Sequence, residues 1–82
     1  MKNRFLKFMK QRFQEQGDCC PVYDWNKFIA NEFSREERDL AIAFTAKLIE
    51  NKYIGLIDKR DIACYAISGY GAEMIKRNKI EV

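Results

Sequence analysis

The sequence predicts a single α+β domain that is mainly helical. Three observations support this prediction. Segments in the first 51 residues repeat apolar side chains at helical spacing, two short β-type runs follow them, and the junction "YAISGYGAEMI" at residues 65–75 joins the second run to a serine and two glycines. A chain of 82 residues has room for one thin apolar core, so residues 1–82 are expected to form one domain.

The composition is that of a folded soluble domain, with 48% hydrophobic and 33% charged residues and one proline. The longest nearly apolar run, Leu40 to Ala46, is far shorter than the roughly 18 to 20 residues that a membrane span requires. Lys7 and Lys10 interrupt any signal-peptide core, so we expect a cytoplasmic protein. Residues 1–16 hold five basic side chains and one acidic one, which concentrates positive charge at the amino end.

The three cysteines, Cys19, Cys20 and Cys64, are predicted to be reduced structural thiols. An odd number does not form a disulfide framework, and a chain without histidine lacks the usual additional zinc ligand. Redox or metal chemistry of these thiols is the alternative. We expect no cofactor, no metal and no catalysis, because Ser34 and Ser68 are both explained as helix caps and no imidazole base is present.

Residues 3–16 are predicted to form an amphipathic helix that ends at Gly17. Its apolar side chains follow helical spacing. They are Phe5, Leu6, Met9 and Phe13. The basic side chains of this helix are Lys2, Arg4, Lys7, Lys10 and Arg12. This pattern also fits a membrane-surface anchor, but a small domain needs these apolar residues for its core.

The next segment, Cys19 to Val22, is predicted to be extended because proline disfavours helix in the residue before it. Asp24 is the expected N-cap of a second helix, with Tyr23 and Phe28 in the positions of a hydrophobic staple. The side chains that this helix is expected to bury are Trp25, Phe28, Ile29 and Phe33.

Ser34 and Glu37 have the spacing of a capping box, which predicts a third helix running to about Asn51. The expected buried arc of this helix consists of Leu40, Ala41, Phe44, Leu48 and Ile49. At about 100° per residue, the opposite face holds Glu36, Asp39, Ala43, Ala46, Lys47 and Glu50.

The runs Ile54–Ile57 and Ile62–Ile67 predict a hairpin. The four residues Asp58 to Asp61 suit a loop built on a type I turn. Tyr65 and Ile67 share one face of the second strand. Ser68 is then the expected cap of a last helix, residues 71–79, in which Gly71 allows close backbone packing.

This order of elements is that of a winged helix-turn-helix domain, with a three-helix core, a short β-hairpin wing and a C-terminal helix. The segment "LIENKYIGLIDKRDIACYAISGYGAEMI" resembles the carboxyl half of compact winged-helix regulators. The residues that match the family pattern are Leu48, Tyr53, Ile54, Tyr65, Ile67, Ser68, Gly71 and Met74.

The resemblance implies a small transcriptional regulator or accessory factor that binds duplex DNA. The third helix would enter the major groove and the hairpin tip would touch the backbone or minor groove beside it. The candidate DNA contacts are Arg35, Arg38, Lys47, Lys59 and Arg60. The alternative for the first three is local pairing with Glu36, Glu37 or Glu50, and for the last two a solvated turn neutralised by Asp58 and Asp61.

A second hypothesis is a protein-protein interaction module without strong DNA binding. It uses the acidic, alanine-rich face of the third helix, where the candidate interface residues are Glu36, Asp39, Ala43, Ala46 and Glu50. A homodimer is also considered, through this face or through the first and last helices, where Met74, Ile75 and Ile80 exceed what one short packing stripe needs.

Overall fold

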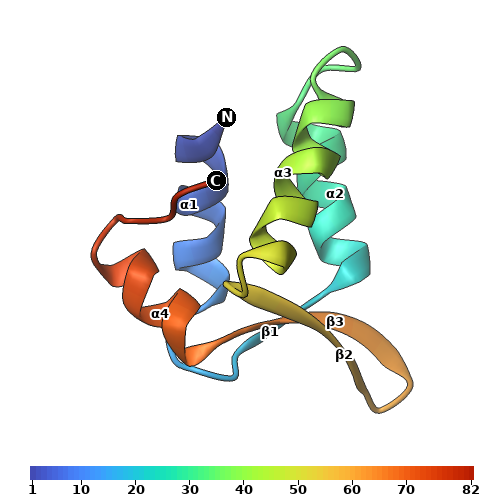
Figure 1. Ribbon diagram of the computed structural model, residues 1–82. Helices are drawn as coiled ribbons and strands as arrows, with labels where there is room; N and C mark the ends of the chain where they lie inside the picture. The colour runs from blue at the N-terminus through green and yellow to red at the C-terminus, as the bar shows by residue number, and fades with distance from the viewer.

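In the computed structural model, which describes residues 1–82, the chain folds into a mainly helical α+β structure. The elements are α1 (Lys2–Arg12), β1 (Cys19–Pro21), α2 (Val22–Glu32), α3 (Arg38–Glu50), β2 (Ile54–Lys59), β3 (Ile62–Ile67) and α4 (Gly69–Lys76). The three strands form an antiparallel sheet in the order β1-β3-β2. Figure 1 shows α1 and α4 on one side, α2 and α3 on the other, and the hairpin of β2 and β3 extending away from the helices. No helix is both long enough and apolar enough to cross a membrane.

Phe5 of α1 lies at the centre of an aromatic core. It is fully buried, and its ring stacks on Phe44 of α3 with the centroids 4.6 Å apart. It also contacts Trp25 of α2, whose indole nitrogen donates a hydrogen bond of 3.0 Å to the hydroxyl of Thr45. That hydroxyl donates in turn to the carbonyl of Ala41, so the polar groups inside this core are satisfied.

The burial of α1 shows where its apolar residues are used. Phe5, Met9 and Phe13 are buried, and Leu6 and Phe8 pack against the same cluster. The apolar stripe that also fitted a membrane anchor is therefore occupied by the core.

The predicted end of α1 is wrong. The helix stops at Arg12 instead of Gln16, and Phe13 is already extended. The cause lies outside the helical pattern: the Asp18 carboxylate accepts the backbone N–H groups of Gln14 and Glu15, at 2.8 and 3.0 Å. A side chain that offers the backbone a different acceptor competes with the helix, and here it turns the chain toward β1.

The predicted cap of α2 is also wrong. The helix begins at Val22, directly after Pro21, and Asp24 lies within its first turn without a capping hydrogen bond. The carboxylate of Asp24 instead pairs with Arg12 at 3.0 Å. Tyr23 is exposed, so the expected staple with Phe28 does not form.

Only half of the predicted capping box before α3 is present. The Glu37 carboxylate accepts the Ser34 backbone N–H at 3.0 Å, but Ser34 to Glu37 form a separate turn, and α3 begins at Arg38. The reciprocal bond is absent because the Glu37 backbone N–H donates to the Ser34 carbonyl.

The observed buried face of α3 is rotated about the helix axis from the predicted one. Ala41 and Leu48 are buried as expected and Phe44 is half-buried, whereas Leu40 and Ile49 are exposed. Thr45 takes a core position because its hydroxyl is the hydrogen-bond partner of the buried Trp25 indole.

The hairpin turn has two residues, where four were predicted. Pairing continues through Lys59 and Ile62, so only Arg60 and Asp61 lie outside the ladder. Both have positive φ, 52° and 65°, as a type I′ turn requires. This turn matches the twist of the strands and lengthens the hairpin.

The junction before α4 confirms the prediction made for it. The Ser68 hydroxyl accepts the Gly71 N–H at 2.8 Å. A Cβ on Gly71 would lie 2.1 Å from the Tyr53 carbonyl oxygen, so the backbone approach found here requires glycine.

The last helix starts earlier than predicted and ends at Lys76, because Asn78 has a φ of 54° and turns the chain back. Ile75 and Ile80 are buried in the core, which is why they are not the dimer surface that was considered for them.

Candidate interaction surface

The solvent-facing side of α3 carries large apolar side chains. Leu40 is 63% exposed, Ile42 59% and Ile49 38%. We call this side the α3 face, and its exposed residues are Asp39, Leu40, Ile42, Ala43, Ala46, Lys47, Ile49 and Glu50. Large apolar side chains exposed on one helix make this side a candidate interaction surface.

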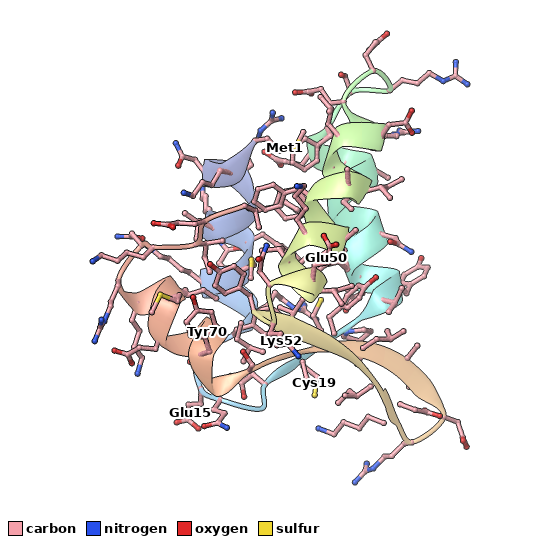
Figure 2. The ribbon with its side chains drawn as sticks, viewed as in Figure 1. Met1, Glu15, Cys19, Glu50, Lys52 and Tyr70 are labelled. Atoms are coloured by element: carbon pink, nitrogen blue, oxygen red, sulfur yellow. The ribbon has the colours of Figure 1, made fainter.

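Acidic side chains run along the middle of the α3 face. Asp39 and Glu50 are about three helical turns apart, so they project in nearly the same direction. Neither forms an ion pair. Glu50 stands on the near side of α3 in Figure 2. The α3 face therefore has negative charge at its centre and apolar side chains on its flanks.

The flank toward α2 is hollowed. An open cavity of about 200 Å³ lies between α2, α3 and β3. We call it the α2–α3 groove, and its lining includes Trp25, Ile29, Ile42, Thr45, Ile49 and Tyr65. A second hollow of about 270 Å³ shares Ile29 and Ile42 with it and reaches Arg38. This flank is thus concave, mainly apolar and open to solvent.

The flank toward α1 is covered in part by the end of the chain. Leu40, Phe44 and Lys47 line an open depression of about 400 Å³ with Met1 and Val82. The α3 face therefore has an apolar hollow on each flank, and the groove toward α2 is the one formed by helices and the sheet without the chain ends.

The structure does not bring the predicted DNA contacts together. Because successive helical residues are rotated by about 100°, Arg38 and Lys47 project from opposite sides of α3. Arg35 lies in the turn between α2 and α3, at the end of the molecule opposite the hairpin turn that holds Arg60 (Figure 1). Lys59 ends β2 beside that turn.

The local ion pairs considered for these cations are absent. Arg35, Lys47, Lys59 and Arg60 form no ion pair, and the Lys59 Nζ lies 3.8 Å from the Cys19 sulfur. Arg38 makes one long contact, 3.5 Å, to the Ala30 carbonyl oxygen. All five predicted contacts are exposed.

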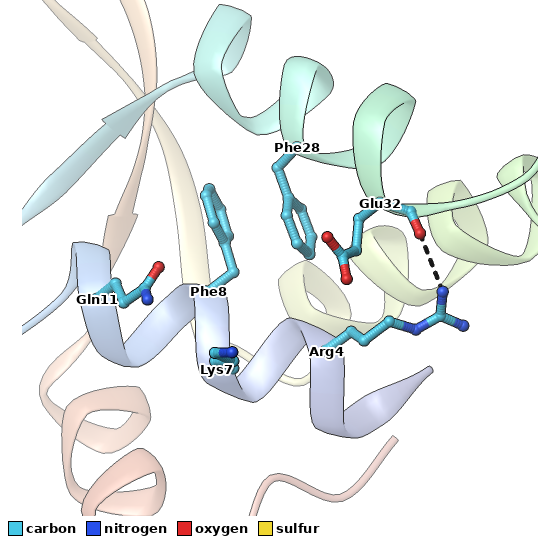
Figure 3. A pocket seen from close by; sticks show the side chains of 6 residues that line it. All are labelled: Arg4, Lys7, Phe8, Gln11, Phe28 and Glu32. Carbon is cyan, nitrogen blue, oxygen red and sulfur yellow. Dashed lines mark hydrogen bonds between the residues drawn. The ribbon is translucent and has the colours of Figure 1, made fainter.

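One of the three carboxylates considered as local partners binds elsewhere. Glu37 pairs with Arg4 of α1 at 2.8 Å. The hydrogen bond from Arg4, helped by the Ser34 backbone N–H, lowers the pKa of Glu37 to about 2. Figure 3 shows Arg4 reaching across to the end of α2, where it also donates to the Glu32 carbonyl at 3.0 Å.

The five residues of the predicted protein interface, Glu36, Asp39, Ala43, Ala46 and Glu50, are all exposed. The sequence interpretation missed Leu40, Ile42 and Ile49 as surface residues. Leu40 and Ile49 had been assigned to the core. A core arc centred on Ala41 and Thr45 would have left all three outside.

The three thiols are free. Cys20 and Cys64 are buried and Cys19 is partly exposed. Burial raises the pKa of the Cys20 thiol. No three of the Cys, Asp and Glu side chains gather where they could hold a metal ion.

Comparisons of this chain with protein-family models, with curated protein sequences and with solved structures gave no match.

Proposed function

We propose that this protein is a winged-helix binding domain whose α3 face docks a segment of another protein. The order of helix, strand, two helices, hairpin and helix supports the fold assignment. In this assignment β2 and β3 form the wing and α3 occupies the place of the recognition helix.

The observation that carries the proposal is the exposure of Leu40, Ile42 and Ile49 on a helix whose central charges are negative. Large apolar side chains drive protein association when they leave water. Carboxylates in the middle of the same face repel nucleic-acid phosphates, which dominate DNA affinity. The α3 face thus suits a protein better than a DNA groove.

The charges also define the partner. A basic amphipathic helix would place apolar residues in the α2–α3 groove and cations beside Asp39 and Glu50. A second copy of the chain fits less well. In an antiparallel two-fold pairing of α3 centred between Ala43 and Ala46, Asp39 of one copy would face Glu50 of the other, and like charges in an interface oppose association.

The test uses nuclear magnetic resonance titration with a synthetic leucine-lysine amphipathic helix and a scrambled peptide of the same composition. We expect shifts concentrated at the amides of Ile42, Ala46 and Ile49, and weaker binding of the scrambled peptide. Ile42→Glu should weaken binding by roughly tenfold or more, since a hot-spot side chain contributes about 2 kcal/mol. Ile62→Glu is the matched control, because Ile62 is an exposed isoleucine on the hairpin, 55% accessible.

Shifts confined to other surfaces, or equal losses in the two variants, would refute the proposal. Light scattering tests whether the partner is a second copy of the chain. If the protein has the mass of a dimer and Ala43→Glu has the mass of a monomer, the α3 face binds a second copy instead of another protein.

Duplex DNA binding through the wing is the second candidate function. The observation that favours it is the pair of exposed cations at the tip of the hairpin, Lys59 at the end of β2 and Arg60 in the turn. Neither forms an ion pair, and the hairpin extends from the body (Figure 1). Binding to random-sequence duplex should fall steeply with salt and weaken when Lys59 and Arg60 become alanine. Failure to bind at low salt would reject this candidate.

A further inference from the structure

The side of the molecule formed by α1 and the end of α4 carries a second charged surface. The two helices pack side by side (Figure 1), and the Lys10 ammonium donates a hydrogen bond to the side-chain oxygen of Asn78, just after α4. The exposed cations here are Lys7, Lys10, Lys76, Arg77 and Lys79, and we call them the α1–α4 surface. The two lysines of α1 are far in sequence from the three cations at residues 76–79, and the fold brings the two groups to the same side of the molecule.

The positive charge of this surface is largely uncompensated. Residues 1–14 contain no acid, and Glu73 is the one acid of α4. Glu73 pairs with Arg77 at 3.0 Å, whereas the four lysines form no ion pair. Figure 2 shows nitrogen-tipped side chains along the outer edge of these helices.

The arginines of α1 serve a different purpose from its lysines. Arg4 is held by Glu37, and Arg12 by Asp24, each across to another element. Figure 3 shows Arg4 reaching toward α2, and Lys7 lining the same hollow between α1 and α2 without forming an ion pair. The arginines of α1 thus form ion pairs with other elements, whereas its lysines form none.

The surface lacks the apolar side chains that a membrane or a protein partner would use. None of the exposed large apolar residues belongs to α1, and the single one on α4, Tyr70, lies in its first turn, away from Lys76. Peripheral membrane helices insert apolar side chains between lipids, and protein interfaces centre on buried apolar or aromatic anchors. Phe8 and Phe28 line a hollow with Lys7, but neither is among the exposed large apolar residues, so no exposed apolar anchor stands beside these lysines.

We propose that the α1–α4 surface binds the phosphate backbone of duplex nucleic acid without reading its sequence. Lysine ammonium groups are compact point charges on flexible stems and fit phosphates in varied positions. The aromatic side chains beside Lys7, Phe8 and Phe28, are half-buried and stack on each other with the centroids 4.0 Å apart, which favours a duplex over a single strand whose bases would need a free ring. The proposal is independent of the α3 face, which belongs to the helix pair on the other side of the molecule (Figure 1).

The experiment measures fluorescence anisotropy of a labelled random-sequence duplex over a series of salt concentrations. Changing Lys7, Lys10, Lys76 and Lys79 together to glutamine should weaken binding by roughly tenfold or more at low salt. The slope of log K against log salt should fall by about 0.9 for each phosphate that the variant no longer neutralises. The matched control changes Lys27, Arg35, Lys47 and Lys52 to glutamine and leaves the hairpin cations Lys59 and Arg60 in place. These four cations are also exposed and form no ion pair, so the two variants have the same net charge.

We expect the control to retain most of the affinity and slope. Equal losses in both variants, a larger loss in the control, or no binding by the unmodified protein would overturn the proposal. Stronger binding to vesicles of neutral lipid with phosphatidylserine than to the duplex at the same salt would also overturn it. If the fourfold variant unfolds, Lys7→Gln with Lys76→Gln replaces it, because this pair leaves the Lys10 contact to Asn78 intact, and half of the slope change is then expected.

Discussion

The helices α1 and α3 have similar lengths, 11 and 13 residues, but leave opposite kinds of side chain in solvent. Every large apolar side chain of α1 is buried or half-buried, and its outer side is polar and basic. α3 leaves Leu40, Ile42 and Ile49 exposed beside acids. The difference is also seen where each helix meets α2: the hollow between α1 and α2 has mainly polar lining residues, whereas the α2–α3 groove is mainly apolar.

This comparison predicts that the apolar side chains of the two helices have different roles, in folding stability for α1 and in binding for α3. Apolar side chains of α1 should contribute to the free energy of unfolding, and those of the α3 face should contribute little until a partner covers them. The largest expected effect is therefore at Phe5. Phe5→Ala removes the centre of the aromatic core and should lower the free energy of unfolding by about 3–5 kcal/mol.

The matched change on the other helix is Ile42→Ala, which should alter the free energy of unfolding by about 0.5 kcal/mol or less because the side chain is mostly in solvent. Urea denaturation followed by tryptophan fluorescence measures both. Phe5→Leu provides a milder variant if Phe5→Ala does not fold. A cost for Ile42→Ala close to that of the core variant would remove the contrast between the two helices.

The second prediction concerns the closure of α4 over α1. Gly71→Ala places a Cβ against the Tyr53 carbonyl and the Ile67 side chain, so the helix must shift away. We expect a loss of roughly 3 kcal/mol, the upper part of the usual range for overpacking. Thermal unfolding should show it.

Gly55→Ala is the control for this change, since an added Cβ there meets no atom within 4 Å. It should be neutral or slightly stabilising. If both substitutions lower the free energy of unfolding by the same amount, close packing at Gly71 does not determine the position of α4.

The third prediction tests why α3 is rotated from its expected orientation. Thr45→Val keeps the shape but removes the acceptor of the Trp25 indole, and should cost about 1–3 kcal/mol. Thr45→Ser retains the hydroxyl and should cost less. Equal stabilities of the valine variant and the parent would show that the hydrogen bond does not fix the rotation.

The order of the elements and the Ser68-Gly71 junction were predictable because they depend on neighbouring residues. A serine three positions before a helical N–H is a local cap, and apolar periodicity is a local pattern. The ends of α1 and α2 were not, since they depend on Asp18 and on the pairing of Arg12 with Asp24. Apolar periodicity does not predict the hydrogen-bond and ion-pair partners of these polar side chains.

The candidate surfaces also contain residues that the sequence predicted and residues that it missed. The acidic and alanine positions of α3 were assigned to its outer face by helical projection. The apolar flank was missed because a threonine is an improbable core residue until its tryptophan partner is known. The α1–α4 surface was missed because residues 76–79 come beside α1 only through the close approach at Gly71.

The smallest expected effect concerns the contact that joins the two compared helices, the pair of Arg4 in α1 and Glu37 before α3. The pKa of Glu37, about 2 in the folded protein, is below its ordinary value of 4.5. A depressed folded pKa means that the carboxylate stabilises the fold above its unfolded pKa, and that this contribution is lost as the pH falls from about 4.5 toward 2. The effect is small because the two side chains are 35% and 37% exposed, and solvent screens the pair.

Urea midpoints of the parent and of Glu37→Gln, measured from pH 7 to pH 2, test this contact. The parent should be the more stable protein at pH 7, and the difference should shrink below pH 4.5, since protonation removes the charge that the substitution has already removed. Glu36→Gln is the adjacent control: Glu36 forms no ion pair, so its substitution should give no such convergence. A difference that stays constant down to pH 2 would mean that the Ser34 N–H, which a glutamine side chain also accepts, holds this turn without the charge. Convergence in Glu37→Gln alone would show that Arg4 anchors α1 to the start of α3 electrostatically, in contrast to the lysines of α1, which form no ion pair.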